Sequence, residues 1–593
     1  MFDHLHRSVV RTLGLIMLLG APAHGSTVDD GLSLWPRSER CYLVGEASTP
    51  VWAKLPASAA IQQPLELRIK LPAAFRITAF ETAQNAYAGN PAHLVVPGSL
   101  TRSEQGDEAE YIVALPGISA PSAASLSLMM NPGGVRPGAY AIQFALSSAD
   151  GKRRWPPLTG TAEVLPRLDG RRPSRLRIQL YSYSSDKSAA YQDEALATLS
   201  KTGINQICYM RPSASADVVT QRALAYGLKP LWLWFWPKEK AAILDALPEA
   251  RRLDADRSPM NELCYAWCIE HRKTVKRALV EYLRPRIEAS GYAGLINDNE
   301  ERAFDSERLE IAGDVATPAT LEQFRKHAQL PAELELTARI ISDRYRDAWI
   351  DFRCWQSAQM SAILSESVTA VDPGLDYGYY SGYKHAGRLA ALTRARYATD
   401  WGLLGKIGGI RFGTAGYAGS PGDLTATARA LAPRPFVPAE MYLENFTKSS
   451  APSPERFSYR LMCALMYGTG GFGIWYQQVL DGAAYAAIGQ VTALAADIED
   501  LLLDGRRCDG DLVIGEGFDA GSIMAYELGG KRLVVAFNHG AEPRTLALRW
   551  READGRGETV DLVSGKNFGA APALTTTLGP RSYVALMTVT DGN

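Results

Sequence analysis

The chain has 593 residues, a formal net charge of -1 and 21% charged residues. A chain of this length exceeds one ordinary hydrophobic core, since domains average roughly 150 residues. The near-zero net charge gives no electrostatic reason to expect nucleic acid or an anionic membrane surface as a partner, and we expect neither. The 12 Trp and 26 Tyr supply flat apolar faces that stack on sugar rings as well as fill cores.

The N-terminus has the pattern of a cleavable signal peptide. Arg7 and Arg11 precede the apolar run Leu13–Leu19, and a small residue, Gly25, ends the segment. The run is too short to span a bilayer as an ordinary transmembrane helix. We therefore predict a signal peptide over residues 1–25 and a mature protein in the periplasm or outside the cell, with no insertion into the membrane.

Short strands of alternating polarity follow the signal peptide. Segments such as PLELRIKL, YIVAL and YAIQFAL alternate between apolar and polar residues and are separated by Pro, Gly and Ser. No helical periodicity comes between them, which is typical of an all-β sandwich. The pattern predicts an N-terminal β-sandwich domain over residues 26–170.

Residues 171–503 alternate apolar strands with longer helical stretches, which is the pattern of βα units. Eight strands are predicted, and eight is the number that closes a (β/α)8, or TIM, barrel. They cover residues 175–183, 204–210, 229–236, 293–298, 375–380, 409–415, 435–442 and 471–477. From residue 504 to 593 the alternating pattern returns and predicts a C-terminal β-sandwich domain. The predicted fold is a central catalytic barrel between two β-sandwiches.

Seven cysteines are present, and in an exported chain they could form disulfides that leave at least one unpaired. Cys264 and Cys268 in NELCYAWCIEH, with His271 nearby, suggest a zinc site, but the spacing lacks a second pair of ligands. We favour buried or disulfide-bonded cysteines and predict neither a metal nor a cofactor.

In a (β/α)8 barrel the reactive groups lie at the C-terminal ends of the strands. The predicted strand ends carry many Trp and Tyr around a few acids, and this is the composition that a sugar-binding cleft needs. The residues that we predict to bind substrate there are Tyr183, Arg211, Trp236, Tyr380, Tyr442 and Trp475. Arg211 is equally compatible with a solvated loop charge.

Three tryptophans, Trp232, Trp234 and Trp236, share one face of the third predicted strand by period two. Filling the core explains them at least as well as lining a sugar subsite. Trp236 is the best placed of the three for a cleft, because it stands last in the strand.

Two carboxylates can supply the pair of carboxyl groups that glycoside hydrolysis requires. Glu300 follows the fourth strand in GLINDNEERAF, and Glu440 ends the seventh in FVPAEMY. Strands four and seven lie across a barrel mouth, so the two carboxyls could flank a glycosidic bond. A separation of about 5 to 5.5 Å would retain the anomeric configuration, and about 6.5 to 9.5 Å would invert it. Asp298 and Glu301 are rivals of Glu300, and we expect these two acids to face away from the axis or to raise the pKa of Glu300 by like charge. Glu444 is a rival of Glu440.

Asn299 and Glu300 after strand four, with Glu440 after strand seven, resemble the clan A retaining glycoside hydrolases, whose acid/base Glu follows an Asn on strand four. The run DNE at 298–300 is similar to that of the family 42 β-galactosidases, and WIDFRCWQSAQMSAILSESVTAVDPGLDYG resembles the helix and strand that come next in that family. The opening strand pattern of that family is not found, Glu301 stands where it has Tyr, and the leading sandwich is a further departure.

The resemblance implies that Glu300 is the general acid/base, that Asn299 binds the sugar 2-hydroxyl, and that Glu440 is the nucleophile. It implies a retaining hydrolase that cleaves β-glycosidic bonds of an oligo- or polysaccharide. Three residues are candidate donors that would keep the nucleophile ionised: Tyr380, Tyr383 and Arg411. The alternative is a carbohydrate-binding protein in which the barrel has lost catalysis. The sandwiches could bind polysaccharide, but packing against the barrel is the favoured role.

Overall fold

The computed structural model describes residues 31–56, 64–83, 99–115, 125–183, 188–209, 214–235, 243–254, 256–299, 301–305, 310–382, 390–416, 420–443, 451–475, 480–551, 557–570 and 573–590. The predicted signal peptide, residues 1–25, lies outside these ranges. Within them, none of the helices combines the length and the hydropathy of a membrane-spanning segment.

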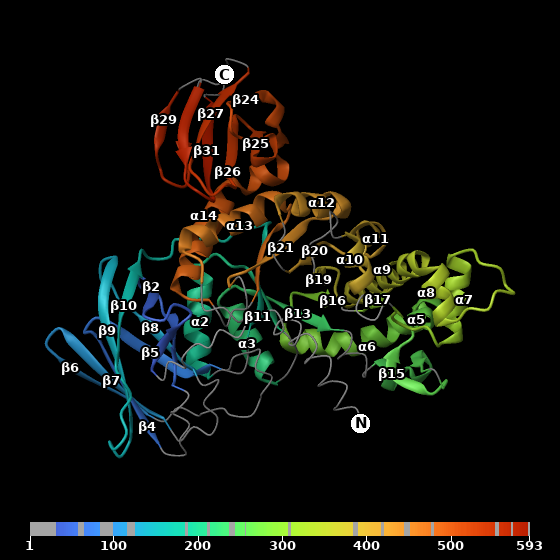
Figure 1. Cartoon of the computed structure of the whole chain (residues 1–593), viewed down its shortest axis with the longest axis horizontal. Helices are drawn as coiled ribbons and strands as arrows, with labels where there is room; N and C mark the ends of the chain where they lie inside the picture. Colours follow the sequence, from blue (N-terminus) through green and yellow to red (C-terminus); the bar gives the residue numbers. More distant parts are fainter. Residues whose placement is uncertain are drawn as a thin grey trace.

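A closed barrel of eight parallel strands forms the centre of the molecule (Figure 1). Each strand pairs with the next, and the last pairs with the first. In barrel order the strands are β11 (Arg177–Tyr183), β12 (Gln206–Tyr209), β13 (Lys229–Phe235), β16 (Gly294–Asp298), β19 (Asp376–Ser381), β20 (Phe412–Ala415), β21 (Phe436–Met441) and β22 (Gly471–Trp475). They coincide with the eight predicted segments, so the predicted barrel is confirmed.

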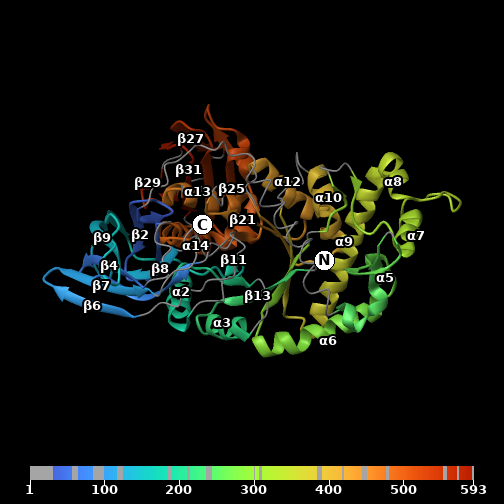
Figure 2. The ribbon, with the colours of Figure 1, turned by 60° about the horizontal axis from the view of Figure 1, so that its bottom comes forward.

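Helices surround the barrel and cover its outer face (Figure 2). Those that follow barrel strands include α2 (Ala189–Lys201), α3 (Ala214–Ala225), α6 (Arg272–Ser290), α9 (Arg346–Val371), α11 (Trp401–Ile407), α12 (Pro421–Leu431), α13 (Pro454–Tyr467) and α14 (Gly482–Asp504). The smaller elements lie in two excursions of the chain, one before β16 and one after it, apart from α10, which precedes α11. They are β14 (Arg251–Leu253), β15 (Pro259–Leu263), α5 (Tyr265–Glu270), β17 (Phe304–Asp305), β18 (Glu310–Ile311), α7 (Pro318–His327), α8 (Ala338–Arg344) and α10 (Ala390–Tyr397).

The predicted N-terminal β-sandwich is confirmed as a four-stranded sheet, β1-β3-β8-β5, and a six-stranded sheet, β2-β10-β9-β4-β7-β6, around one hydrophobic core. The strands are β1 (Ser33–Trp35), β2 (Arg40–Val44), β3 (Thr49–Lys54), β4 (Leu65–Pro72), β5 (Arg76–Ala83), β6 (Leu100–Gln105), β7 (Glu108–Leu115), β8 (Ser125–Asn131), β9 (Gly138–Ser148) and β10 (Leu158–Leu165). The predicted domain boundary at residue 170 falls between β10 and β11.

The predicted C-terminal β-sandwich is confirmed as a six-stranded sheet, β23-β25-β26-β31-β28-β29, and a three-stranded sheet, β24-β27-β30. The strands are β23 (Arg506–Arg507), β24 (Leu512–Ile514), β25 (Ile523–Leu528), β26 (Lys531–Asn538), β27 (Arg544–Trp550), β28 (Gly557–Asp561), β29 (Asn567–Gly569), β30 (Ala573–Leu578) and β31 (Ser582–Thr590). Figure 1 shows this domain in red, next to α13 and α14.

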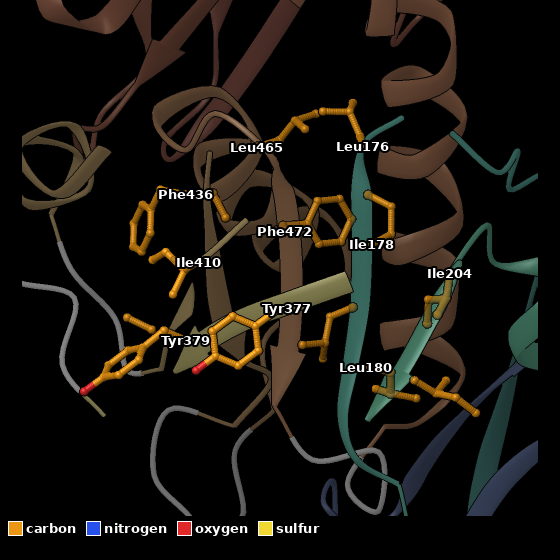
Figure 3. Packing of buried hydrophobic residues seen from close by; sticks show 14 of the residues in the cluster. Leu176, Ile178, Leu180, Ile204, Tyr377, Tyr379, Ile410, Phe436, Leu465 and Phe472 are labelled. Atoms are coloured by element: carbon orange, nitrogen blue, oxygen red, sulfur yellow. The ribbon is translucent and has the colours of Figure 1, made fainter. Parts of the chain in front are cut away.

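Successive side chains of each barrel strand alternate between the barrel axis and the surrounding helices. Figure 3 shows the helix side of this packing, with Ile178 of β11 beside its register partner Phe472 of β22. Trp232 and Trp234 of β13 are fully buried on the same side, where both rings contact Tyr282 of α6. The core-filling interpretation of these two tryptophans is therefore confirmed.

A buried carboxylate on α14 fixes the point where the chain enters the barrel. Glu499 accepts hydrogen bonds from the backbone N–H groups of Ser174, Arg175 and Leu176 at 3.0, 2.6 and 2.7 Å. Burial raises the pKa of Glu499, but these hydrogen bonds and one from the Ser174 hydroxyl outweigh it, and the pKa lies below its ordinary value. The ionised carboxylate therefore stabilises the fold.

Replacing Glu499 by Gln should lower the free energy of unfolding by about 2–4 kcal/mol, because the neutral amide satisfies fewer of the buried donors. Asp500→Asn is the matched control, since this neighbouring side chain is 76% exposed and its change should stay within about 0.5 kcal/mol. Urea unfolding of the full chain measures both. A Glu499→Gln protein as stable as the control would contradict the assignment.

The effect of Glu499→Gln should also depend on pH. The folded-state pKa is lowered, so the stabilisation is fully present above the unfolded value of about 4.3 and is lost as the pH falls through the folded value. The difference between wild type and Glu499→Gln should therefore shrink in acid.

Candidate functional site

Three buried aromatic rings from different strands, those of Tyr181, Tyr380 and Trp475, pack against one another on the axis side of the barrel, and we call them the aromatic wall. Tyr380 of β19 and Trp475 of β22 stack with ring centroids 4.9 Å apart and an interplanar angle of 13°. Trp475 also stacks on Tyr181 of β11, with centroids 5.2 Å apart. Tyr380 and Trp475 stand at or next to the C-terminal ends of their strands. The structure thus brings together two of the residues predicted to bind substrate.

Asp298, the last residue of β16, lies on the axis side next to this wall. Ile296 belongs to the axis-facing cluster, so period two places Asp298 on the same side. In the sheet Asp298 is the register partner of Tyr380, and it is 8% exposed. Among the described strand-end residues, Asp298 is the carboxylate that faces the axis.

Tyr181 connects the aromatic wall to a polar column deeper in the barrel. Its hydroxyl contacts Gln179 and lies 2.9 Å from the Thr414 hydroxyl. Gln179 donates to Gln206 at 2.7 Å, and Gln206 donates to Asp376 at 3.4 Å. Burial, with smaller contributions from Cys208 and Asp298, raises the pKa of Tyr181 well above its ordinary value. Tyr181 therefore stays neutral and can act as a hydrogen-bond donor.

Asn299 turns its side chain toward α9. Its Nδ2 donates to the Tyr379 hydroxyl at 2.8 Å and to the Ser357 hydroxyl at 3.2 Å. Tyr379 belongs to the helix-facing cluster. The Asn299 amide nitrogen is therefore engaged in the helix shell, and its predicted contact with a sugar hydroxyl stays a prediction.

Glu301 also turns toward α9. Its carboxylate lies 3.2 Å from the guanidinium of Arg353, which is 2% exposed and also donates to Gln356 at 2.6 Å. Arg353 and Ser357 stand one turn apart on α9, so this helix anchors the residues on both sides of position 300. Glu300, the predicted acid/base, lies outside the described residues.

Glu440, the predicted nucleophile, lies on the helix side of β21. Its neighbours Ala439 and Met441 belong to the axis-facing cluster, so period two directs Glu440 the other way. Its carboxylate lies 3.2 Å from the guanidinium of Arg460 on α13, and Arg460 also donates to the Met441 carbonyl. In this conformation Glu440 is paired in the shell, and its role as nucleophile stays a prediction.

Tyr442 is fully buried and belongs to the helix-facing cluster. Its hydroxyl donates to Asp481 at 2.6 Å and accepts from Arg37 of the N-terminal sandwich at 2.9 Å. Burial raises its pKa well above the ordinary value. In the described structure Tyr442 connects two domains, and its predicted contact with substrate stays a prediction.

Among the remaining predicted site residues, the structure places Arg411 away from the strand ends and does not describe the side chains of the others. Arg411 precedes β20 and donates to the Pro373 carbonyl, so it lies at the opposite end of the barrel from the strand ends and cannot supply a donor there. Tyr183 ends β11, and nothing is described of its side chain. The other predicted residues lie outside the described residues: Arg211, Trp236, Tyr383 and Glu444.

All seven cysteines are buried and free. Cys264 caps α5, where its Sγ accepts a hydrogen bond from the Trp267 backbone at 3.4 Å. The His271 ring stacks on Trp267 with centroids 4.2 Å apart. Across the described ranges, no three His, Cys, Asp or Glu side chains form a group that could hold a metal ion.

The structure contradicts the expectation that Asp298 faces away from the axis, since alternation with Ile296 gives it a place on the axis side. The signal that could have found it is the alternation Ile296–Asp298, but β16 is buried on both faces. Apolar residues on both faces hide which of them meets the axis.

Glu301→Gln should lower the free energy of unfolding by about 3 kcal/mol, because it leaves the buried Arg353 without its counter-charge. The double variant Glu301→Gln/Arg353→Met should recover much of this loss. A double-mutant cycle in urea measures the coupling. Asp343→Asn, which breaks the exposed Arg339–Asp343 pair, is the control and should cost less than about 0.5 kcal/mol. If the changes in the free energy of unfolding caused by Glu301→Gln and Arg353→Met simply add, the interaction between these two side chains is contradicted.

No family model matches this chain, and comparison with curated proteins finds no match. Solved structures that align with it include a candidate alpha-galactosidase from Bacteroides fragilis, with 10% identity over 95% of this chain and 100% of that one and a TM-score of 0.40. An alpha-amylase from Anoxybacillus has 10% identity over 70% and 98%, with a TM-score of 0.43. A beta-galactosidase from Marinomonas ef1 has 11% identity over 55% and 60%, with a TM-score of 0.39. These values are too low to assign a family or an activity to this chain.

Proposed function

We propose that this chain is a glycoside hydrolase that binds carbohydrate over the C-terminal mouth of the barrel. The observation that carries the proposal is the wall of Tyr181, Tyr380 and Trp475 with the carboxylate of Asp298 beside it. Aromatic faces stack on the C–H faces of sugar rings, and carboxylates bind hydroxyls or move protons. The mouth of a (β/α)8 barrel is also where such enzymes carry out their chemistry.

Hydrolysis of a glycosidic bond needs two carboxyl groups. One protonates the leaving oxygen, and the other attacks the anomeric carbon or activates a water. In the retaining form implied by the sequence resemblance, Glu300 is the acid/base, Glu440 is the nucleophile, and the substrate is a β-linked oligo- or polysaccharide. Glu440 would then have to exchange Arg460 for the substrate.

Asp298 is the competing second carboxylate. It already lies on the axis side next to Tyr380, so it needs no rearrangement to face a sugar bound against the aromatic wall. The two assignments therefore predict opposite outcomes: turnover is lost in Glu440→Gln if Glu440 is the second carboxylate, and in Asp298→Asn if Asp298 is.

The ion pair between Glu440 and Arg460 favours one alternative function. If the pair persists and no second carboxylate acts, the barrel would bind carbohydrate without cleaving it. Such a protein would retain the aromatic wall and its sugar affinity.

The decisive experiment is a reducing-sugar screen of the full chain over bacterial and plant polysaccharides. NMR would follow the anomeric configuration released first. On the substrate so found, Glu300→Gln should lower kcat by about 10³-fold or more, the loss typical of removing a catalytic group. Asp298→Asn should match that loss if Asp298 is the second carboxylate, and should retain most turnover if Glu440 is. Glu440→Gln should match that loss if Glu440 is the nucleophile, and should retain most turnover if Asp298 is. Glu288→Gln, on the exposed face of α6, is the control.

Other outcomes of the same screen separate the two functions. Binding without hydrolysis, weakened by Trp475→Ala, would support the carbohydrate-binding protein. Full activity in both Asp298→Asn and Glu300→Gln would contradict the catalytic assignment, and neither binding nor hydrolysis on any glycan would contradict the proposed function.

We also propose that the protein is exported. The basic and apolar N-terminal pattern supports removal of residues 1–25. Expression of the full chain in a Gram-negative host should give a periplasmic or secreted protein whose N-terminus is Ser26. N-terminal sequencing checks this, and a cytoplasmic protein that keeps Met1 would contradict it.

A further inference from the structure

The N-terminal sandwich contacts the barrel where three connections leave the C-terminal ends of neighbouring strands. These connections join β11 to α2, β21 to α13, and β22 to α14. The strands β21, β22 and β11 are consecutive around the barrel. The sandwich therefore borders one continuous sector of the mouth, and β22 in this sector carries Trp475.

Arg37, in the turn between β1 and β2, holds two of these connections. Its guanidinium donates to the Tyr442 hydroxyl at 2.9 Å and to the Pro452 carbonyl at 2.5 Å, and so binds both ends of the β21–α13 connection. It also donates to the Asp481 carboxylate at 3.2 Å, at the end of the β22–α14 connection. The ring of Tyr42 lies 4.6 Å below the guanidinium and fixes its plane.

Asp481 makes this contact cooperative. It is buried, caps α14 by accepting from the Ala484 N–H at 3.0 Å, and accepts from the Tyr442 hydroxyl at 2.6 Å. Arg37, Tyr442 and Asp481 thus form a closed triangle of hydrogen bonds. A buried Arg–Asp pair is costly to desolvate and is weak evidence for stability, which points to a role in geometry.

Glu81 of β5 holds the third connection. Its carboxylate accepts from the backbone N–H of Ser188, the N-cap of α2. Nearby, the Tyr191 hydroxyl of α2 lies 2.6 Å from the Ser127 hydroxyl of β8 in a buried contact. The sandwich therefore fixes the start of α2 as well as the start of α14.

We propose that Arg37 and Glu81 are positioning residues, and that the N-terminal sandwich is a working part of the carbohydrate site. Arg37 acts through Tyr442 and Asp481 on the ends of β21 and β22, and so sets the orientation of Trp475. Glu81 acts through Ser188 on the end of β11, two residues beyond Tyr181. The role in catalysis rests on the proposed function, whereas the role in positioning does not.

Hydrogen–deuterium exchange of the full chain, without any ligand, tests the positioning. Arg37→Gln should speed exchange at the first turn of α14 and around Tyr442 by about tenfold or more, since each tenfold corresponds to 1.4 kcal/mol of local opening. Arg37→Lys should behave similarly, because one ammonium cannot bind the acceptors of both connections. Glu81→Gln should speed exchange at the start of α2.

Arg68→Gln is the matched control. Arg68 pairs with Glu66 on an exposed face of the same sandwich, at 2.7 Å, and its loss should leave exchange around the barrel mouth unchanged. Wild-type exchange in Arg37→Gln, full rescue by Arg37→Lys, or faster exchange spread over the whole chain would each overturn the proposal.

Kinetics on the substrate found in the screen separate this inference from the proposed function. Arg37→Gln should lower kcat/KM by about 10- to 100-fold, the effect of a small misplacement remote from the chemistry, mainly by raising KM as Trp475 loses its orientation. An unchanged KM in Arg37→Gln would contradict the claim that Arg37 sets the orientation of Trp475. If Arg37→Gln changes local exchange but the chain cleaves no glycan, the positioning role of Arg37 is supported and the hydrolase function is contradicted.

Discussion

The barrel strands are buried on both faces, and this constraint decides what every strand-end residue can do. A side chain lies either at the axis or among the helices, and the next residue lies on the other side. In β16 and β21 the alternation sends Asp298 to the axis and Glu440 to α13. The chemistry available at the mouth therefore follows from the phase of each strand, meaning which of its alternate residues face the axis, as much as from residue type.

The fold could be predicted largely from the sequence, because the alternation of strand and helix patterns repeats along the chain. Apolar runs mark the eight strands, and their number implies closure. The phase of each strand could not be predicted in the same way. In FVPAEM, for example, every residue is buried, so no polar side marks the outer face of the strand. Phase becomes visible when partners distant in sequence, such as Arg460 for Glu440, are brought into contact.

The aromatic residues show the same limit in a different form. Trp234 and Trp475 look alike in sequence, since each stands near the end of an apolar strand. Trp234 packs against α6, whereas Trp475 stacks on Tyr380 across the barrel interior. Tyr442 is bound by a contact that only folding creates, with Arg37 more than 400 positions earlier in the chain. Cross-domain contacts of this kind leave no local pattern.

The polar column below Tyr181 has a consequence for how the barrel closes. Apolar interiors tolerate a slip of one strand against the next, because one Leu or Val fills space much like another. The chain Gln179–Gln206–Asp376, completed by the ion pair of Arg177 with Asp376 at 2.8 Å, matches donors to acceptors across three strands. A slipped register would leave these groups buried and unpaired. The column thus favours the correct strand register during folding, because barrels with a shifted register are less stable even without a ligand.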